Sequence, residues 1–268
     1  MWNSTFNIAY NDSEVKYLGE GVEKLSIDGA SARSGNVTVQ SIVGQPYGEL
    51  VGYKYKRVDG QIVYENGIAQ HSDELENLGT GVYKVTGGWR NEFTYKDFTL
   101  SFLLDFKAGA KLFSGTNYTL YSNGLHKNTL TGRGAHGNGS IVGKGVMPVK
   151  NAAGEVTGYV PNTVAVTAQE YWQGIVSNNI AEEFTYNASF IKLRELSLGY
   201  TFPQSLLGKQ KLVKGLTVSL VGRNLWTILK HTDNIDPESA YNNTNGQGLE
   251  LNGYPATRSV GFNLNVKF

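Results

Sequence analysis

Residues 83–107 read YKVTGGWRNEFTYKDFTLSFLLDFK and contain two alternating stretches joined by a short turn. In the first stretch, large apolar side chains recur at every second position, at Tyr83, Val85, Trp89, Phe93 and Tyr95. In the second stretch they recur at Phe98, Leu100, Phe102, Leu104 and Phe106. Because successive side chains of a β-strand point to opposite faces, each stretch predicts a strand with one apolar face and one polar face.

The same two-residue period returns in four further stretches, at residues 2–10, 195–202, 216–226 and 259–268. Short connections at residues 95–97 and 203–211 alternate with long ones at residues 11–82, 108–188 and 229–256. Long unstructured loops are rare in soluble domains, whereas transmembrane barrels combine short periplasmic turns with long external loops. The stretches also match the ~9–11 tilted residues with which a strand crosses a bilayer.

The sequence therefore predicts an all-β fold, namely an antiparallel transmembrane β-barrel segment of six long strands with long extracellular loops. Six strands cannot close a membrane pore alone, because the smallest such barrels have about eight. Local patterns add a hairpin within residues 48–64 that turns at Asp59-Gly60, and a short helix at residues 168–175. Glu182-Glu183 is expected to be a solvated pair after that helix.

The composition excludes several classes of protein. Lys and Arg number 24 and Asp and Glu number 23, so the net charge is 24 − 23 = +1 and no nucleic-acid partner is expected. The chain has no Cys, which removes disulfides, thiolate metal sites and Cys nucleophiles. It has no run of roughly 18 or more apolar residues that could form a transmembrane helix. A strand pattern begins at residue 2 without a secretory signal before it, as expected of a fragment or a processed product.

Aromatic residues gather at both ends of the predicted strands. At the short-turn ends lie Tyr95, Phe98, Tyr200, Phe202 and Phe268, and at the long-loop ends lie Tyr10, Tyr83, Phe106 and Trp226. Two such groups are typical of a barrel wall that meets water on both sides of a membrane. The alternative is that these rings form the core of a β-sandwich.

Several motifs resemble one known family. Residues 189–201 (SFIKLRELSLGYT), Gly222–Trp226 (GRNLW) and residues 235–238 (IDPE) resemble the strand signatures of SusC/RagA-type TonB-linked outer-membrane transporters. Residues 43–48 (VGQPYG), residues 114–121, Gly253-Tyr254-Pro255 and a last strand that ends in Phe268 fit the same family. These motifs occur in the family's order along nearly the whole chain.

The resemblance implies that residues 1–268 are the C-terminal portion of a receptor barrel of about 22 strands, without the plug domain and signal peptide. It implies a place in the cell outer membrane of a Gram-negative bacterium, in contact with outer-membrane lipid. It also implies a SusD-like surface lipoprotein as partner, and TonB through the N-terminal part of the family that is not in this sequence. The expected activity is import of a nutrient, with an oligosaccharide favoured over a peptide.

The resemblance further implies that the chain ends in the periplasm and that the long loops are extracellular. The last strand then looks like the signal read by the outer-membrane insertion machinery, carried by Phe262, Leu264, Val266 and Phe268. The alternative is a C-terminal strand that simply finishes on its buried face.

No motif supports catalysis. Residues 138–145 do not match a phosphate-binding loop, the four His have no metal-ligand spacing, and no GxSxG motif is present, so an enzyme is not expected. The densest carboxylate cluster, Asp233, Asp236 and Glu238, could bind Ca²⁺ in a flexible loop, although a turn at Asp236-Pro237-Glu238 is favoured. No other metal and no cofactor are expected.

Aromatic residues of the loops are the candidates for ligand contact. They are Tyr118, Tyr121, Tyr171, Trp172, Tyr241 and Tyr254. Such rings could stack on sugars or hold peptide side chains, or they could pack the loops onto one another. The polar strand positions Arg90, Glu92, Arg194, Glu195 and Arg223 either line a solvent pathway or form a network in the wall. A rival hypothesis from another class is a soluble, surface-exposed β-sandwich that binds glycans.

Overall fold

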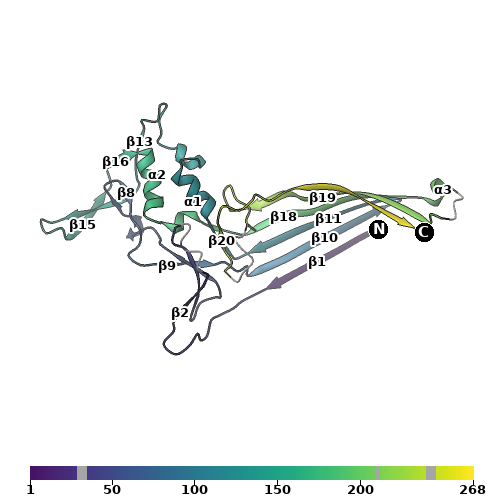
Figure 1. Cartoon of the computed structure of the whole chain (residues 1–268), viewed down its shortest axis with the longest axis horizontal. Helices are drawn as coiled ribbons and strands as arrows, with labels where there is room; N and C mark the ends of the chain where they lie inside the picture. The colour runs from purple at the N-terminus through teal and green to yellow at the C-terminus, as the bar shows by residue number, and fades with distance from the viewer. Residues whose placement is uncertain (29–34, 209–211, 240–245) are drawn as a thin grey trace.

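A computed structural model describes residues 1–268 except 29–34, 209–211 and 240–245. It consists of one long sheet and, at one end of that sheet, a folded region made of the connecting segments (Figure 1). We call this region, the described residues of 11–84, 109–189 and 231–258, the loop assembly. Both chain ends lie toward the end of the sheet opposite the loop assembly (Figure 1).

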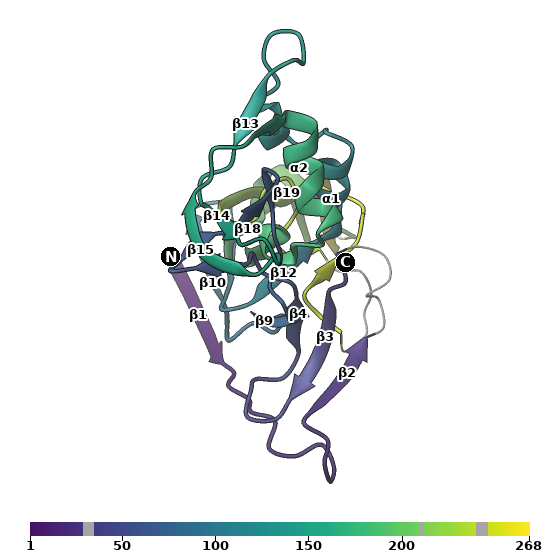
Figure 2. The same ribbon diagram turned by 90° about the vertical axis from the view of Figure 1, so that its left-hand side faces the viewer.

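Six antiparallel strands form the long sheet in the order β1-β10-β11-β18-β19-β21. Their bounds are Trp2–Tyr10 (β1), Val85–Tyr95 (β10), Phe98–Ala108 (β11), Phe190–Phe202 (β18), Gly215–Lys230 (β19) and Ser259–Lys267 (β21). The six predicted strands are therefore confirmed, and β18 and β19 continue further toward the loop assembly than their alternating pattern reaches. β1 and β21 are the open edges, and the two chain ends lie on opposite sides in the view along the sheet (Figure 2).

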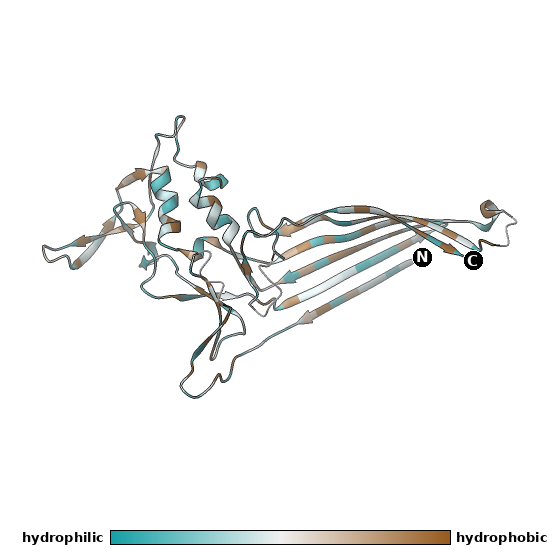
Figure 3. Ribbon diagram, viewed as in Figure 1, coloured by the Kyte–Doolittle hydropathy of each residue, from teal (hydrophilic) through white to brown (hydrophobic). Residues whose placement is uncertain are grey.

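The sheet is a single layer with one apolar and one polar side. On the apolar side, Trp2 is 63% exposed and Phe262 is 82% exposed. Cross-strand pairs such as Phe262↔Leu220 and Leu198↔Leu220 continue this surface across the strands. Apolar and polar positions alternate along each strand (Figure 3). Because these apolar side chains are exposed rather than packed against a second sheet, the β-sandwich hypothesis is wrong.

Aromatic rings mark both ends of the sheet as predicted, with one exception. At the short-turn end the Phe98 and Tyr200 rings lie 4.8 Å apart, and at the other end Tyr10 and Trp226 are exposed. Tyr83 instead precedes β10, which begins at Val85, and its hydroxyl donates to the Pro237 carbonyl at 2.9 Å. Its ring therefore packs against the Phe190 ring and segment 232–239, because Tyr83 lies before the first paired residue of the strand.

A β-bulge in β18 brings two consecutive charges to the polar side of the sheet. Leu104 pairs with Leu193 while Leu103 pairs with Glu195, which leaves Arg194 as the extra residue. The Arg194 guanidinium bonds Asp105, and Glu195 bonds Arg223 at 3.2 Å. Since a bulge interrupts the alternation of side chains, two neighbouring residues can face the same side.

The loop assembly contains short sheets and helices. Its strands are Lys24–Asp28 (β2), Thr38–Ile42 (β3), Glu49–Gly52 (β4), Arg57–Val58 (β5), Gln61–Ile62 (β6), Tyr64–Glu65 (β7), Ile68–Ala69 (β8), Glu76–Thr80 (β9), Lys111–Ser114 (β12), Ser140–Val142 (β13), Val146–Lys150 (β14), Val156–Pro161 (β15), Ala165–Thr167 (β16), Thr185–Asn187 (β17) and Leu249–Glu250 (β20). Its helices are Gly115–Ser122 (α1) and Ala168–Ser177 (α2), with 3-10 turns at Lys127–Leu130 and Ala181–Phe184, whereas Gln204–Leu207 (α3) lies in the short connection after β18. No helix among the described residues is long and apolar enough to cross a membrane.

Two local predictions have different outcomes. The helix predicted at residues 168–175 is α2, which begins with a capping box between Thr167 and Glu170. The turn at Asp59-Gly60 is also present, with φ of 50° and 77°, values that suit a tight hairpin. The hairpin itself is only β5 and β6, because β4 pairs with β3 and β9 instead.

The hydrophobic core of the molecule lies in the loop assembly and not in the sheet. Its largest fully buried side chains include Phe113, Tyr121, Phe184 and Ile180. The long connections, predicted as loops, thus fold into a packed unit. The buried residues that contact one another are far apart in the sequence, so no local sequence pattern predicts this packing.

Candidate functional site

Four of the loop aromatics predicted as ligand contacts meet within the loop assembly. The Trp172 ring lies edge-on to Tyr121 at 5.4 Å and to Tyr171 at 4.9 Å, measured between ring centres. The Tyr121 and Tyr118 rings both contact Phe184, at 4.9 and 5.3 Å. Helices α1 and α2 supply these rings, so the aromatic cluster joins the two helices.

Hydrogen bonds hold the same aromatic residues in place. Tyr121 is only 1% exposed, and its hydroxyl donates to Glu183 at 2.9 Å. The Tyr118 hydroxyl donates to the Val176 carbonyl at 3.0 Å, and the Trp172 indole donates to the Thr131 carbonyl at 3.1 Å. Burial, together with the nearby Glu183 carboxylate, raises the pKa of Tyr121. These contacts correspond to the packing alternative stated above, and a role in ligand contact stays a prediction for these four residues.

The acidic pair after α2 is not a solvated pair. Glu182 accepts two hydrogen bonds from the Arg57 guanidinium, at 2.7 and 2.9 Å, and Glu183 accepts from the hydroxyls of Tyr55 and Tyr121. Burial acts against ionisation of Glu182, but the Arg57 and Tyr55 hydrogen bonds lower its pKa. The prediction of solvation was wrong because the partners lie more than 60 positions away along the chain.

The two other predicted ligand contacts lie elsewhere. Tyr241 lies outside the described residues. Tyr254 is 99% exposed, and it borders a cavity at the junction of the sheet and the loop assembly. Among the predicted ligand contacts that the structure describes, Tyr254 is the one whose ring is fully accessible.

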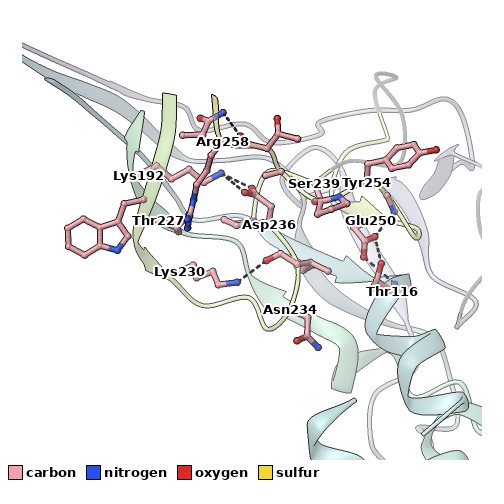
Figure 4. Close-up of a pocket in the computed structure, with 18 residues that line it drawn as sticks. Thr116, Lys192, Thr227, Lys230, Asn234, Asp236, Ser239, Glu250, Tyr254 and Arg258 are labelled. Atoms are coloured by element: carbon pink, nitrogen blue, oxygen red, sulfur yellow. Dashed lines mark hydrogen bonds and ion pairs between the residues drawn. The ribbon is translucent and has the colours of Figure 1, made fainter. Parts of the chain in front are cut away.

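This cavity, here called the rim cavity, has a volume of about 490 Å³ (Figure 4). Strands β18 and β19 line one side of it with Lys192, Thr227 and Lys230. The segments 234–239 and 250–258 line the other side. Because Lys192 pairs across the sheet with Asp105 and Thr227, on the polar side, the rim cavity opens on that side of the sheet.

An ionic cluster of six side chains fixes one wall of the rim cavity. Its members are Asp105, Lys107, Lys192, Arg194, Asp236 and Glu238. Lys192 as a residue is only 4% exposed, and its ammonium lies 2.7 and 2.9 Å from the two Asp236 oxygens and 2.7 Å from Glu238. Arg194 bonds both Asp105 and Glu238. Three cations and three carboxylates therefore neutralise one another where the sheet meets segment 232–239.

The cluster has a clear electrostatic consequence for Glu238. Burial acts to raise its pKa, but hydrogen bonds from Lys192 and Arg194, and the charge of Lys192, outweigh burial and lower the pKa to about 2. Glu238 is thus an anion at any physiological pH, and the positive strand residues keep it so.

The three carboxylates considered for Ca²⁺ do not converge on one point. Asp236 and Glu238 face Lys192, whereas Asp233 lies 3.0 Å from the Lys127 ammonium and 3.5 Å from His126 Nε2. Among the residues that the structure describes, no group of three potential ligands could hold a metal ion. In place of a cation from solvent, these oxygens face lysine and arginine side chains of the protein.

Glu250 is a structural carboxylate that the sequence did not single out. Its two oxygens accept from the Ser114 and Thr116 hydroxyls and from the backbone N–H groups of Thr116 and Gly253, at 2.6–3.2 Å. It thereby attaches β20 to the first turn of α1. The only local signal would have been the hydroxyl residues at 114 and 116, whose partner is more than 130 positions away.

The remaining predicted positions lie on the sheet. Arg223 forms its ion pair with Glu195, and Arg90 and Glu92 lie further along β10. Phe262, Leu264 and Val266 pair with apolar residues of β19, and Phe268 follows directly after β21. These four residues have the geometry expected of the assembly signal, and that role stays a prediction.

Comparisons with known proteins extend over the whole chain. No protein-family model matches it. It is 25% identical to "TonB-dependent receptor P3" and 22% identical to "TonB-dependent receptor P39", both from Formosa agariphila. All of this chain aligns in both cases, but it spans only 27% and 28% of those proteins. The chain thus has about a quarter of the length of the curated relatives it matches.

Solved structures show the same fold. A chain of the RagAB peptide transporter superposes with a TM-score of 0.66 at 18% identity, and one of the RagAB peptide importer in the 'open-open' state with 0.63 at 20%. Both alignments cover all of this chain and 27% of the other. The resemblance to SusC/RagA-type TonB-linked transporters is confirmed. The relatives are receptors and transporters rather than enzymes, in agreement with the expectation from the sequence.

Proposed function

We propose that this chain, which has the SusC/RagA-type barrel fold, supplies the C-terminal wall and capture loops of a TonB-dependent nutrient importer in a Gram-negative outer membrane. The observation that carries the proposal is the single-layer sheet whose apolar side is exposed along all six strands. A surface of this kind is stable against hydrocarbon and unstable against water.

The open edges support a larger wall. The backbone N–H and C=O groups along the outer sides of β1 and β21 would be unsatisfied in lipid, which is prohibitively costly. Further barrel strands of the importer would pair with both edges. The plug that closes the lumen, and the segment that contacts TonB, would belong to the same importer.

The loop assembly would lie at the extracellular mouth, with the short turn at residues 95–98 and helix α3 in the periplasm. Its packed core gives it a fixed shape there. It would offer a SusD-like surface lipoprotein a rigid surface on which to close over the cargo. An oligosaccharide and a peptide remain the two candidate cargoes, and the exposed Tyr254 ring suits contact with either.

Cysteine labelling tests the orientation in an importer from which any Cys outside residues 1–268 has been removed, since these residues contain none. Ser140→Cys lies in β13 of the loop assembly and Ser205→Cys lies in α3, and both serines are exposed. In intact cells that produce the importer, a membrane-impermeant maleimide should label the variant at 140 and not the variant at 205. After lysis, it should label both.

Two results would contradict the proposal. One is recovery of the importer in the soluble fraction without detergent. The other is labelling of the variant at 205 in intact cells with protection of the variant at 140. The matched substitution, serine to cysteine in each case, removes differences in residue chemistry from the comparison.

A further inference from the structure

We infer that the rim cavity is a subsite for a carboxylate group of the cargo, so that the importer selects acidic ligands. This inference rests on the proposed function and adds to it a chemical class of substrate. It is carried by the charges that line the cavity (Figure 4).

The acidic side chains of the cavity wall already have ion-pair or hydrogen-bond partners. Both oxygens of Asp236 accept from Lys192, and Glu238 behind it accepts from Lys192 and Arg194. Glu250 is 1% exposed and accepts four hydrogen bonds from hydroxyl and backbone groups. Asp236 and Glu238 are thus paired with cations, and both oxygens of the buried Glu250 carboxylate already have hydrogen-bond donors.

Two basic side chains of the lining, by contrast, are exposed and have no acidic partner within the described part of the chain. Arg258 is exposed and has no ion pair within the described part of the chain. Lys230 is exposed as well, and its ammonium donates to the Ile235 carbonyl at 3.2 Å, which occupies one of its three N–H groups. The charges of the lining are three basic (Lys192, Lys230, Arg258) and two acidic (Asp236, Glu250), so 3 − 2 = +1.

The neighbouring groups suit a carboxylate on a larger molecule. The cavity is open, and at about 490 Å³ it is large enough for one sugar or amino-acid residue. Tyr254 also borders the cavity, on the side of segment 250–258, where its exposed ring offers a flat apolar surface (Figure 4). Lysine and arginine bind carboxylates through charge-assisted hydrogen bonds, and Arg258 can do so with two parallel N–H groups.

The carboxylate can come from a uronic acid or from an acidic amino acid, and binding experiments separate the two. The purified importer in detergent would be titrated by calorimetry with trigalacturonate and with the tripeptide Glu-Glu-Glu. The matched neutral ligands are maltotriose and Gln-Gln-Gln. We expect one acidic ligand to bind at least about tenfold more tightly than its neutral counterpart, and its affinity to fall as salt rises.

Lys230→Gln and Arg258→Gln should each weaken binding of that acidic ligand about tenfold and leave the neutral ligand unchanged. Lys144→Gln removes an exposed lysine of the loop assembly outside the rim cavity, and it should have no effect. Equal binding of acidic and neutral ligands, or no binding of either acidic ligand, would overturn the inference. So would unchanged affinity in both cavity variants, or an equal loss in Lys144→Gln. The labelling pattern at residues 140 and 205 tests the importer assignment separately, so one can fail while the other holds.

Discussion

At the residue scale, Lys192 is a buried charge that joins the sheet to the loop assembly. It is almost fully buried, its ammonium contacts Asp236 and Glu238, and it lies 4.8 Å from the centre of the Phe190 ring. A buried charge of this kind adds little net stability when it is paired. The loss of one partner, however, leaves the other charges buried without a counter-charge, which is strongly destabilising.

Lys192→Met should lower the free energy of unfolding at pH 7 by about 3–5 kcal/mol, because two carboxylates lose their closest cation. The pKa of Glu238 is depressed in the folded protein to about 2, from 4.5, so its pairing stabilises the fold fully above pH 4.5. That contribution disappears as the pH falls toward 2. The difference between variant and wild type should therefore shrink over this range, as measured by the urea midpoint of the importer in detergent.

The control for this substitution is Lys150→Met. Lys150 forms an exposed ion pair with Glu65 at 3.3 Å, which is worth less than about 1 kcal/mol. If both variants lose the same stability, or if the Lys192→Met deficit is independent of pH, the buried cluster does not hold the junction as described.

At the scale of one element, strand β10 has two adjacent glycines with different amounts of space around them. Gly87 lies under the Phe106 ring, which also stacks on Phe6 at 6.0 Å. A Cβ at Gly87 would lie 2.4 Å from the Phe106 ring and 2.5 Å from the Asn7 carbonyl oxygen. At the next residue, Gly88, the nearest atom would be 3.5 Å away, an ordinary contact.

Gly87→Ala should therefore cost about 1–3 kcal/mol through overpacking of the aromatic pair. Gly88→Ala should not lower the free energy of unfolding, because alanine loses less backbone entropy than glycine when the strand forms. The shift from compact to unfolded mobility on a gel, followed against temperature, measures both variants. Equal melting temperatures of the two variants would show that the Phe106 ring yields without strain.

At the scale of the whole molecule, the decisive feature is the difference between the two sides of the sheet. Phe262 and Asn263 are neighbours near the middle of β21 and lie on the apolar and the polar side. Phe262→Lys places a charge against hydrocarbon and should cost about 2–4 kcal/mol, with loss of the assembled protein from the outer membrane. Asn263→Lys should assemble normally.

Quantifying the importer in outer-membrane fractions checks this pair of variants. Equal amounts of the two variants in the membrane would mean that the apolar side of the sheet does not face lipid. Such a result would contradict the proposed place of this sheet in the wall of a membrane barrel.

The sequence by itself determined the six long strands and their two faces. This was possible because alternation is local: a side chain two positions on points to the same side, whatever the rest of the chain does. The turn at Asp59-Gly60 and the start of α2 were predictable for the same reason. Both depend on residues at most four positions apart.

Only the tertiary structure decided which polar groups meet. Lys192 and Asp236 are 44 positions apart, and their carboxylate–ammonium contact belongs to an ionic cluster where a calcium site had been considered. Arg57 and Glu182 are 125 positions apart, and they form an ion pair where a solvated carboxylate had been expected. The same holds for Tyr121 and Trp172, which pack the loop assembly together, and for the cations of the rim cavity. Charge pairing and burial depend on distances through space, and spacing along the chain does not encode those distances.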